Sequence, residues 1–192
     1  MRAGFAVTMV TTALVVGAAA GCGSSGSGGE TSPSGRSTSA TTTLAAQAPT
    51  GFDPCHDIPT SVLDSEGLDH KATNADSDGS GGAKWRGCIY AAADGYGASI
   101  RTTNITLPMV RSNIGFAVAG EMVIGDRRAL SYHDVDQPDH RAFCLLNLEM
   151  KGGSLEISID NPASSRKTGR LESCDIAKGL ATKLAPLIAS GT

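Results

Sequence analysis

The stretch that decides the fold is Arg141–Asp160, RAFCLLNLEMKGGSLEISID. Apolar residues recur at every second position before the Gly152-Gly153 pair and again after it. A period of two is typical of a β-strand, and two glycines between two such runs predict a tight turn. We therefore expect a β-hairpin with one face in the core of the protein.

Shorter patterns outside the hairpin predict the rest of the sheet. Runs rich in β-branched and aromatic residues, bounded by turn residues, favour three further strands at Lys84–Ala91, Ala98–Thr106 and Arg127–Tyr132. The range Ile114–Ile124 is compatible with either a strand or a helix.

Helices are expected at both ends of the folded region. A short helix begins after Pro59 and ends at Gly67, and a second short helix opens at Leu107. Ser173 is expected to cap a closing helix. Its apolar face comprises Ile176, Leu180, Leu184, Leu187 and Ile188. The predicted fold class is α+β, an antiparallel sheet packed by N- and C-terminal helices.

The N-terminus has the pattern of a lipoprotein signal. Arg2 precedes a run without charge, small residues fill the positions before Gly21, and Cys22 follows at once. A cysteine in this place is typical of a bacterial lipobox, in which the thiol receives S-diacylglycerol and the new N-terminus an N-acyl chain. An uncleaved transmembrane helix is the alternative, but glycines and threonines dilute the short run.

The segment after Cys22 is predicted to be a tether. Gly, Ser, Thr and Pro dominate it, so it offers too little apolar surface to offset the entropy of ordering. The predicted organisation is a signal peptide at 1–21, a lipidated tether at 22–51 and one globular domain at 52–192. The expected location is the extracytoplasmic side of the cell membrane, with the lipid on Cys22 as the membrane contact.

The charge balance argues against a nucleic-acid partner. The whole chain has 16 basic and 19 acidic side chains, a formal net charge of −3. Nucleic-acid binding requires a basic stripe, and an acidic chain does not supply one.

Four cysteines remain for the domain: Cys55, Cys88, Cys144 and Cys174. An even number in an exported domain predicts two disulfides, although the sequence permits three pairings. We favour Cys55–Cys88 and Cys144–Cys174, because each bond would then join a terminal helix to a neighbouring strand. A catalytic thiol is the competing interpretation, but the chain has no Cys-x-x-Cys motif.

Several motifs together resemble an actinobacterial lipoprotein family. They are Phe52-Asp53-Pro54-Cys55, Trp85-Arg86-Gly87-Cys88, Ile124-Gly125-Asp126-Arg127-Arg128-Ala129, and Cys144 and Cys174 before an Ala- and Leu-rich helix. The family is the domain-of-unknown-function family 3558, which includes mycobacterial lipoproteins. This chain departs from its pattern in one respect, since the tryptophan precedes Cys88 rather than following it. The resemblance implies an envelope location and a disulfide-stapled domain, and it implies no catalytic residues.

Two clusters offer ligand-type side chains. Asn74–Gly79 mimics the start of a calcium loop, but Trp85 stands where the loop needs its final acid, so a polar surface loop is the better interpretation. The run His133–His140 also contains three aspartates and could bind a hard metal. A solvated connection around Pro138 is the simpler interpretation.

The sequence therefore leaves two classes of function. The first, which we favour, is a non-enzymatic envelope module that binds a lipid, glycan or protein partner and needs no metal or other cofactor. The second is a metal-dependent or hydrolytic enzyme that uses the His133–His140 cluster. The motifs of serine hydrolases, zinc proteases and phosphate-binding loops are absent from the folded region of the sequence.

Overall fold

The structure is a computed structural model that describes residues 43–70 and 72–189. The predicted signal peptide, Cys22 and most of the predicted tether lie outside these residues. In chain order the elements are α1 (Thr60–Glu66), β1 (Thr73–Asn74), β2 (Ser77–Asp78), the 3₁₀ turn η1 (Ser80–Gly82), β3 (Lys84–Ala91), β4 (Gly97–Thr103), α2 (Leu107–Ser112), β5 (Phe116–Ile124), β6 (Arg127–Asp134), β7 (Phe143–Met150), β8 (Gly153–Asp160), α3 (Ser173–Leu184) and the 3₁₀ turn η2 (Ala185–Leu187).

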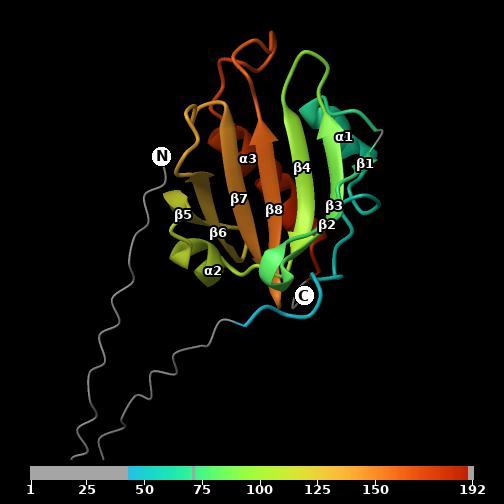
Figure 1. Cartoon of the computed structure of the whole chain (residues 1–192). Coiled ribbons are helices and arrows are strands. Elements are labelled where there is room, and N and C mark those ends of the chain that lie inside the picture. The colour runs from blue at the N-terminus through green and yellow to red at the C-terminus, as the bar shows by residue number, and fades with distance from the viewer. Residues whose placement is uncertain (1–42, 71, 190–192) are drawn as a thin grey trace, which may run out of the picture. The chain divides into compact units, whose positions relative to one another are not determined.

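The strands of the described residues form one antiparallel sheet in the order β1-β3-β4-β8-β7-β6-β5, with β2 also paired to β3. The β7–β8 hairpin lies at its centre, and α3 packs behind these two strands (Figure 1). The predicted α+β architecture, with an antiparallel sheet and helices from both ends, is confirmed.

One row of side chains shows how the sheet builds its core. Leu146 on β7 pairs with Ile157 on β8, which pairs with Ile100 on β4, which in turn pairs with Cys88 on β3. All four are nearly inaccessible to solvent and belong to the core cluster that also contains Leu180 of α3. The face that meets α3 is called the covered face below.

The hairpin is buried more completely than its alternation predicts. On β7, Leu145 and Asn147 point away from the covered face, yet both are buried. Leu107 and Val110 of α2 join Leu145 in a second apolar cluster on that side. The predicted face is in the core, and α2 also covers part of the second face of these central strands.

The ends of two predicted elements also differ. β4 stops at Thr103 rather than Thr106, because the buried side chain of Asn104 leaves the ladder and accepts a hydrogen bond from the Lys84 backbone at 2.9 Å. The ambiguous range Ile114–Ile124 forms β5, whose register shifts between Val118 and Gly120.

Ser173 does not cap α3 as predicted. The N-cap is Glu172, without a side-chain hydrogen bond to the helix. The Ser173 hydroxyl instead donates to the Arg141 carbonyl oxygen at 2.6 Å, so it ties the start of α3 to the chain entering β7.

Both favoured disulfides are confirmed. Cys55 bonds to Cys88 on β3, and Cys144 on β7 bonds to Cys174 in the first turn of α3. The Asp53-Pro54-Cys55 motif forms the turn that positions Cys55 for its disulfide with Cys88. The Asp53 carboxylate accepts the Cys55 backbone N–H at 2.8 Å, and its carbonyl oxygen accepts the His56 and Asp57 N–H groups.

Residues 43–51, assigned to the tether by composition, contact the domain. They have no helix or strand, but Ala48 is buried. The side-chain amide of Asn104 donates to the Ala45 carbonyl oxygen at 2.7 Å. The chain is therefore held against the domain several residues before Phe52.

The tyrosines give a prediction about alkaline stability. The chain has three, and all are buried: Tyr90, Tyr96 and Tyr132. Burial raises the pKa of each above its usual value, and the adjacent carboxylate of Glu66 raises that of Tyr96 further. Because the folded-state pKa is raised, the stabilisation is complete below the unfolded pKa of about 10 and is lost as pH rises above it.

We expect the native protein at about pH 10.5 to show less tyrosinate absorbance than the protein unfolded in guanidinium, in which most tyrosine side chains are ionised. On further addition of base, the three tyrosines should ionise together as the fold is lost. Ionisation near pH 10 with the far-ultraviolet circular dichroism unchanged would contradict this expectation.

Candidate functional site

The His133–His140 cluster is not assembled around one point. His133 is buried at the end of β6, and its ring stacks on that of His140 with centroids 4.6 Å apart and an interplanar angle of 7°. Asp134, Asp136 and Asp139 are exposed, and the Asp139 carboxylate accepts the backbone N–H groups of the following turn. Parallel stacked rings do not direct two nitrogens at a common ion.

The calcium-like loop has its oxygens engaged elsewhere. The Asp76 carboxylate accepts the Gly87 backbone N–H at 2.9 Å. Asp78 forms ion pairs with Arg86 and Lys84, which hold the pKa of Asp78 below its usual value. These contacts fasten the loop to β3, which agrees with a polar loop.

Gly79 in this loop has a packing role. A Cβ atom there would lie 2.8 Å from the Trp85 ring, so only glycine lets the loop approach the indole. The glycine that resembled the turn of a calcium loop is explained by this contact.

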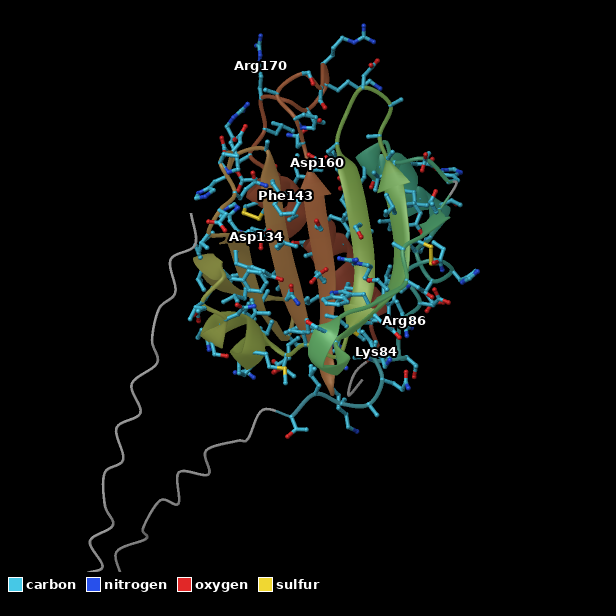
Figure 2. The ribbon with its side chains drawn as sticks, in the orientation of Figure 1. Lys84, Arg86, Asp134, Phe143, Asp160 and Arg170 are labelled. Carbon is cyan, nitrogen blue, oxygen red and sulfur yellow. A yellow bond between two sulfur atoms is a disulfide. The ribbon has the colours of Figure 1, made fainter. Side chains whose placement is uncertain are left out.

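A polar site lies on the opposite side of the sheet from α3. The cross-strand row Asn147–Glu156–Arg101 runs over β7, β8 and β4, one residue out of step with the apolar row of the covered face. No α-helix of the described residues packs over its β8–β4–β3 part, which is called the open face below. Figure 2 views the molecule from this side, with Phe143 and Asp160 labelled near one end of β7 and β8.

Glu156 is the centre of the open face. Its side chain is 7% exposed, and one carboxylate oxygen accepts from the Arg101 guanidinium at 2.6 Å. The other oxygen accepts the Trp85 indole N–H at 3.2 Å. The guanidinium carbon of Arg101 lies 5.6 Å from the Trp85 ring centroid, within the range of a cation–π contact.

The polar network continues toward α2. The Tyr132 hydroxyl donates to the Asn147 side-chain oxygen at 2.9 Å, and the Asn147 amide donates to Ser154 at 2.7 Å. The Ser154 hydroxyl then donates to the Ile105 carbonyl oxygen at 2.6 Å. These buried groups are satisfied by one another, which fixes the polar rows of the sheet in one arrangement.

Arg101 retains capacity for a further partner. Its Nε is buried, and it has no hydrogen-bond partner among residues 43–70 and 72–189. The Arg101 side chain as a whole is 23% exposed beside the buried Glu156. A guanidinium presents donors in a fixed plane, suited to neighbouring acceptor oxygens on one ligand.

Few apolar groups surround this network. Of the large exposed hydrophobic residues, Ile89 is the one on β3, β4 and β8, at 44% exposure. Ser99 and Ser158 are neighbours in the same cross-strand row as Ile89 and are partly exposed. The open face thus presents hydroxyl and guanidinium groups over the buried Glu156 carboxylate, together with Trp85 and Ile89.

A groove of 510 Å³ lies elsewhere, between residues 47–56 and the β1–β3–β4 edge. Its lining mixes Phe52 and Pro54 with charged groups that are already paired, including Asp53 with His56 and Arg86 with Asp78. It is an open depression at the junction of the N-terminal segment with the sheet.

Sequence reasoning did not find the open-face site. The usable signal was Glu156, a charged residue in the middle of a strand that is otherwise apolar or small up to Asp160, together with the single tryptophan of the chain. Their proximity depends on the pairing of β3, β4 and β8, which the sequence does not specify.

Comparison with known proteins identifies the chain by family alone. The model of the family described as "Protein of unknown function (DUF3558)" matches residues 17–187. No curated protein and no solved structure matches the chain. No helix of residues 43–70 and 72–189 is long and apolar enough to cross a membrane.

Proposed function

We propose that this chain, which belongs to the DUF3558 family, is a lipid-anchored envelope lipoprotein whose domain binds a polar glycan on the open face without catalysing a reaction. The observation that carries the glycan assignment is the network of Trp85, Arg101 and Glu156. The lipobox at Cys22 supports the anchor.

The chemistry of the open face favours a glycan over a lipid. An acyl chain requires an apolar enclosure, whereas the groove between residues 47–56 and the β1–β3–β4 edge is open and has charged lining groups. Sugar hydroxyls instead require fixed hydrogen-bonding groups. Arg101 and Glu156 are held by each other, and the serines of the adjacent row add hydroxyls.

A protein partner is less well matched to the same surface. Stable protein interfaces have a core of aromatic and aliphatic anchors. On β3, β4 and β8 the exposed aliphatic side chain is Ile89, and the partly exposed Trp85 has its indole N–H bound to Glu156.

The enzyme alternative gains no support from the geometry. A metal-dependent hydrolase needs side chains that converge on one ion and leave a position for water. His133 and His140 stack in parallel, and the aspartates between them are exposed in a turn. We therefore propose no reaction for this cluster.

Trp85 provides the experiment, because it is the single tryptophan of the chain and lies in the network. The mature full-length protein in detergent would be titrated with soluble fragments of bacterial envelope polysaccharide. We expect a saturable change in Trp85 fluorescence, matched by heat in calorimetry.

The other partner classes are outcomes of the same experiment. A saturable response to short-chain phospholipid, but to no polysaccharide fragment, would assign the open face to lipid and overturn the glycan proposal. A protein partner would replace the glycan if Trp85 fluorescence responds neither to phospholipid nor to polysaccharide fragments, but is quenched in a stoichiometric complex with one envelope protein.

A further inference from the structure

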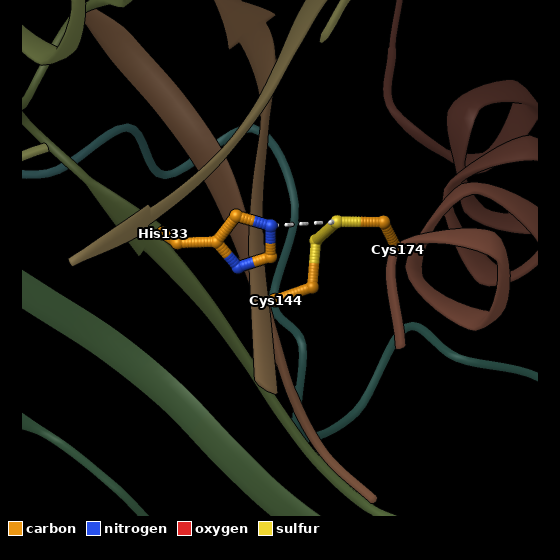
Figure 3. A group of neighbouring side chains, drawn as sticks. All are labelled: His133, Cys144 and Cys174. Carbon is orange, nitrogen blue, oxygen red and sulfur yellow. Dashed lines mark hydrogen bonds between the residues drawn. A yellow bond between two sulfur atoms is a disulfide. The ribbon is translucent and has the colours of Figure 1, made fainter. Parts of the chain in front are cut away.

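One buried histidine lies against the second disulfide. His133 at the end of β6 has its Nε2 3.8 Å from the Sγ of Cys174 (Figure 3). The ligand-type atoms of His133, Cys144 and Cys174 all lie within 4.8 Å of one another. His133 and Cys144 are buried and Cys174 is partly exposed. Three separate elements, β6, β7 and α3, thus bring one imidazole and two sulfurs together.

The orientation of His133 is fixed by an independent contact. Its Nδ1 lies 2.8 Å from the Phe143 carbonyl oxygen, which can only accept, so Nδ1 carries the proton. The lone pair of the neutral ring is then on Nε2, the atom that faces the sulfurs. Histidines that bind metals almost always donate their other N–H to a carbonyl or carboxylate in this way.

The spacing suits a tetrahedral ion. With Zn–S bonds of about 2.3 Å and Zn–N bonds of about 2.0 Å, tetrahedral angles place the nitrogen about 3.5 Å from each sulfur and the sulfurs about 3.8 Å apart. The observed distance of 3.8 Å from Nε2 to the Cys174 Sγ is close to this value. Once the S–S bond is broken, non-bonded contact pushes the two sulfurs apart toward the required separation.

We propose that reduction of the Cys144–Cys174 disulfide converts this cluster into a binding site for a zinc-like divalent cation, with His133 and both cysteines as ligands. A dithiol reductant supplies two electrons and two protons, becomes a disulfide itself and leaves two thiols. The metal binds as these thiols release two protons, and water fills the fourth position. The ion then joins α3 to β7 in place of the disulfide.

This site differs from the metal site that the sequence suggested. His140 stacks on His133 and is exposed, and the proposed ligands come from His133 and the cysteines alone. The proposal is also independent of the glycan-binding function, because the cluster lies at the start of α3, behind the sheet.

Cobalt(II) is a suitable probe, since thiolate–cobalt bonds absorb in the near ultraviolet and tetrahedral cobalt absorbs in the visible. The full-length protein would be reduced anaerobically with a phosphine and titrated with Co²⁺. We expect one equivalent to bind with both signatures, and no such bands from the oxidised protein. Excess Zn²⁺ should displace the cobalt.

Two variants make the test specific. His133→Asn keeps a side-chain N–H near the position of Nδ1 but removes Nε2, and it leaves the disulfide intact so that folding is checked before reduction. We expect it to weaken Co²⁺ binding by at least about 100-fold, more than typical losses outside the ligand set. The control His140→Ala should bind as the wild type does.

Equal binding by His133→Asn and the wild type, or loss of binding in His140→Ala, would overturn the proposal. Failure of the reduced wild type to bind Co²⁺ would overturn it as well. So would loss of the far-ultraviolet circular dichroism on reduction, because the site requires β6, β7 and α3 to remain in place.

Discussion

Cys22→Ala is expected to abolish incorporation of a fatty-acid label and to move the protein from the detergent phase to the aqueous phase. The thiol of Cys22 is the only group in the proposed lipobox that can carry the diacylglycerol. Each buried methylene contributes about 0.8 kcal/mol, and stable anchoring needs at least two chains, so loss of the lipid removes nearly all membrane affinity. The measurement is metabolic labelling and phase partition in a bacterial host that processes lipoproteins.

The matched control removes cysteines of the domain. Cys55→Ala combined with Cys88→Ala eliminates two thiols but leaves Cys22, so it should retain the label in full. If Cys22→Ala remained in the membrane fraction and kept the label, the lipoprotein assignment would be wrong. Retention without label would indicate that the leader itself is a membrane span.

The same double variant tests the contribution of the first disulfide to stability. The bond joins residues 33 positions apart and encloses α1, β1 and β2. In the chain-entropy model a loop of this size stabilises the folded state by about 3–4 kcal/mol. We expect urea unfolding to show this loss, and the melting temperature to fall by about 10 °C.

The wild type under reducing conditions should lose more stability than the double variant, because it loses the Cys144–Cys174 bond as well. In the double variant, a decrease of under about 1 kcal/mol with an unchanged urea dependence would contradict the entropic account. It would mean that residues 43–56 and β3 are held mainly by other contacts, among them the hydrogen bond from the Tyr90 hydroxyl to the Pro54 carbonyl oxygen.

The sequence predicted the parts of the fold that depend on local patterns. The β7–β8 hairpin follows from alternation, α1 ends at Gly67 with φ 66°, and β3 has the predicted bounds. The favoured pairing of the four cysteines also follows from the order of the elements that they join. The hairpin, the end of α1 and the bounds of β3 need only the period of the chain and its turn residues.

The remaining differences arise from tertiary contacts. The bulge between Val118 and Gly120 interrupts the alternation of β5, so its period could not separate strand from helix. Serine is a favoured helix-capping residue, yet the Ser173 hydroxyl donates its hydrogen bond to the carbonyl oxygen of Arg141, 32 residues away. A tertiary hydrogen bond has here replaced the local capping interaction that the sequence predicts.

The family motif around Arg127 illustrates the same limit. Composition gives this arginine no evident role on a strand. In the structure it is nearly buried, and its guanidinium donates to the carbonyl oxygens of Glu149, Ile188 and Ala189. Arg127 thus connects the β5–β6 hairpin to residues 188 and 189. This contact depends on where the segment after α3 lies in the folded protein.

The candidate site depended on the sheet order as well. Trp85, Arg101 and Glu156 are far apart in sequence and meet because β4 lies between β3 and β8. The histidines that were close in sequence stack on each other, and His133 instead faces the disulfide. Closeness in sequence therefore did not predict which metal-ligand side chains lie around a common point in the structure.

The central claim is that the open face, through Arg101, binds an envelope glycan. Its most direct test is the affinity for envelope polysaccharide of Arg101→Gln compared with Arg166→Gln, which removes an exposed arginine paired with Asp94 on a distant loop. Arg101→Lys, which keeps the ion pair with Glu156 without the planar fork, guards against a general loss of folding.

We predict that Arg101→Gln weakens glycan binding by at least about tenfold, as expected for lost hydrogen bonds to a charged group. Arg101→Lys should be intermediate, and Arg166→Gln should bind within about twofold of the wild type, because exposed pairs contribute little. Equal affinities for the wild type, Arg101→Gln and Arg166→Gln would contradict the proposed binding face.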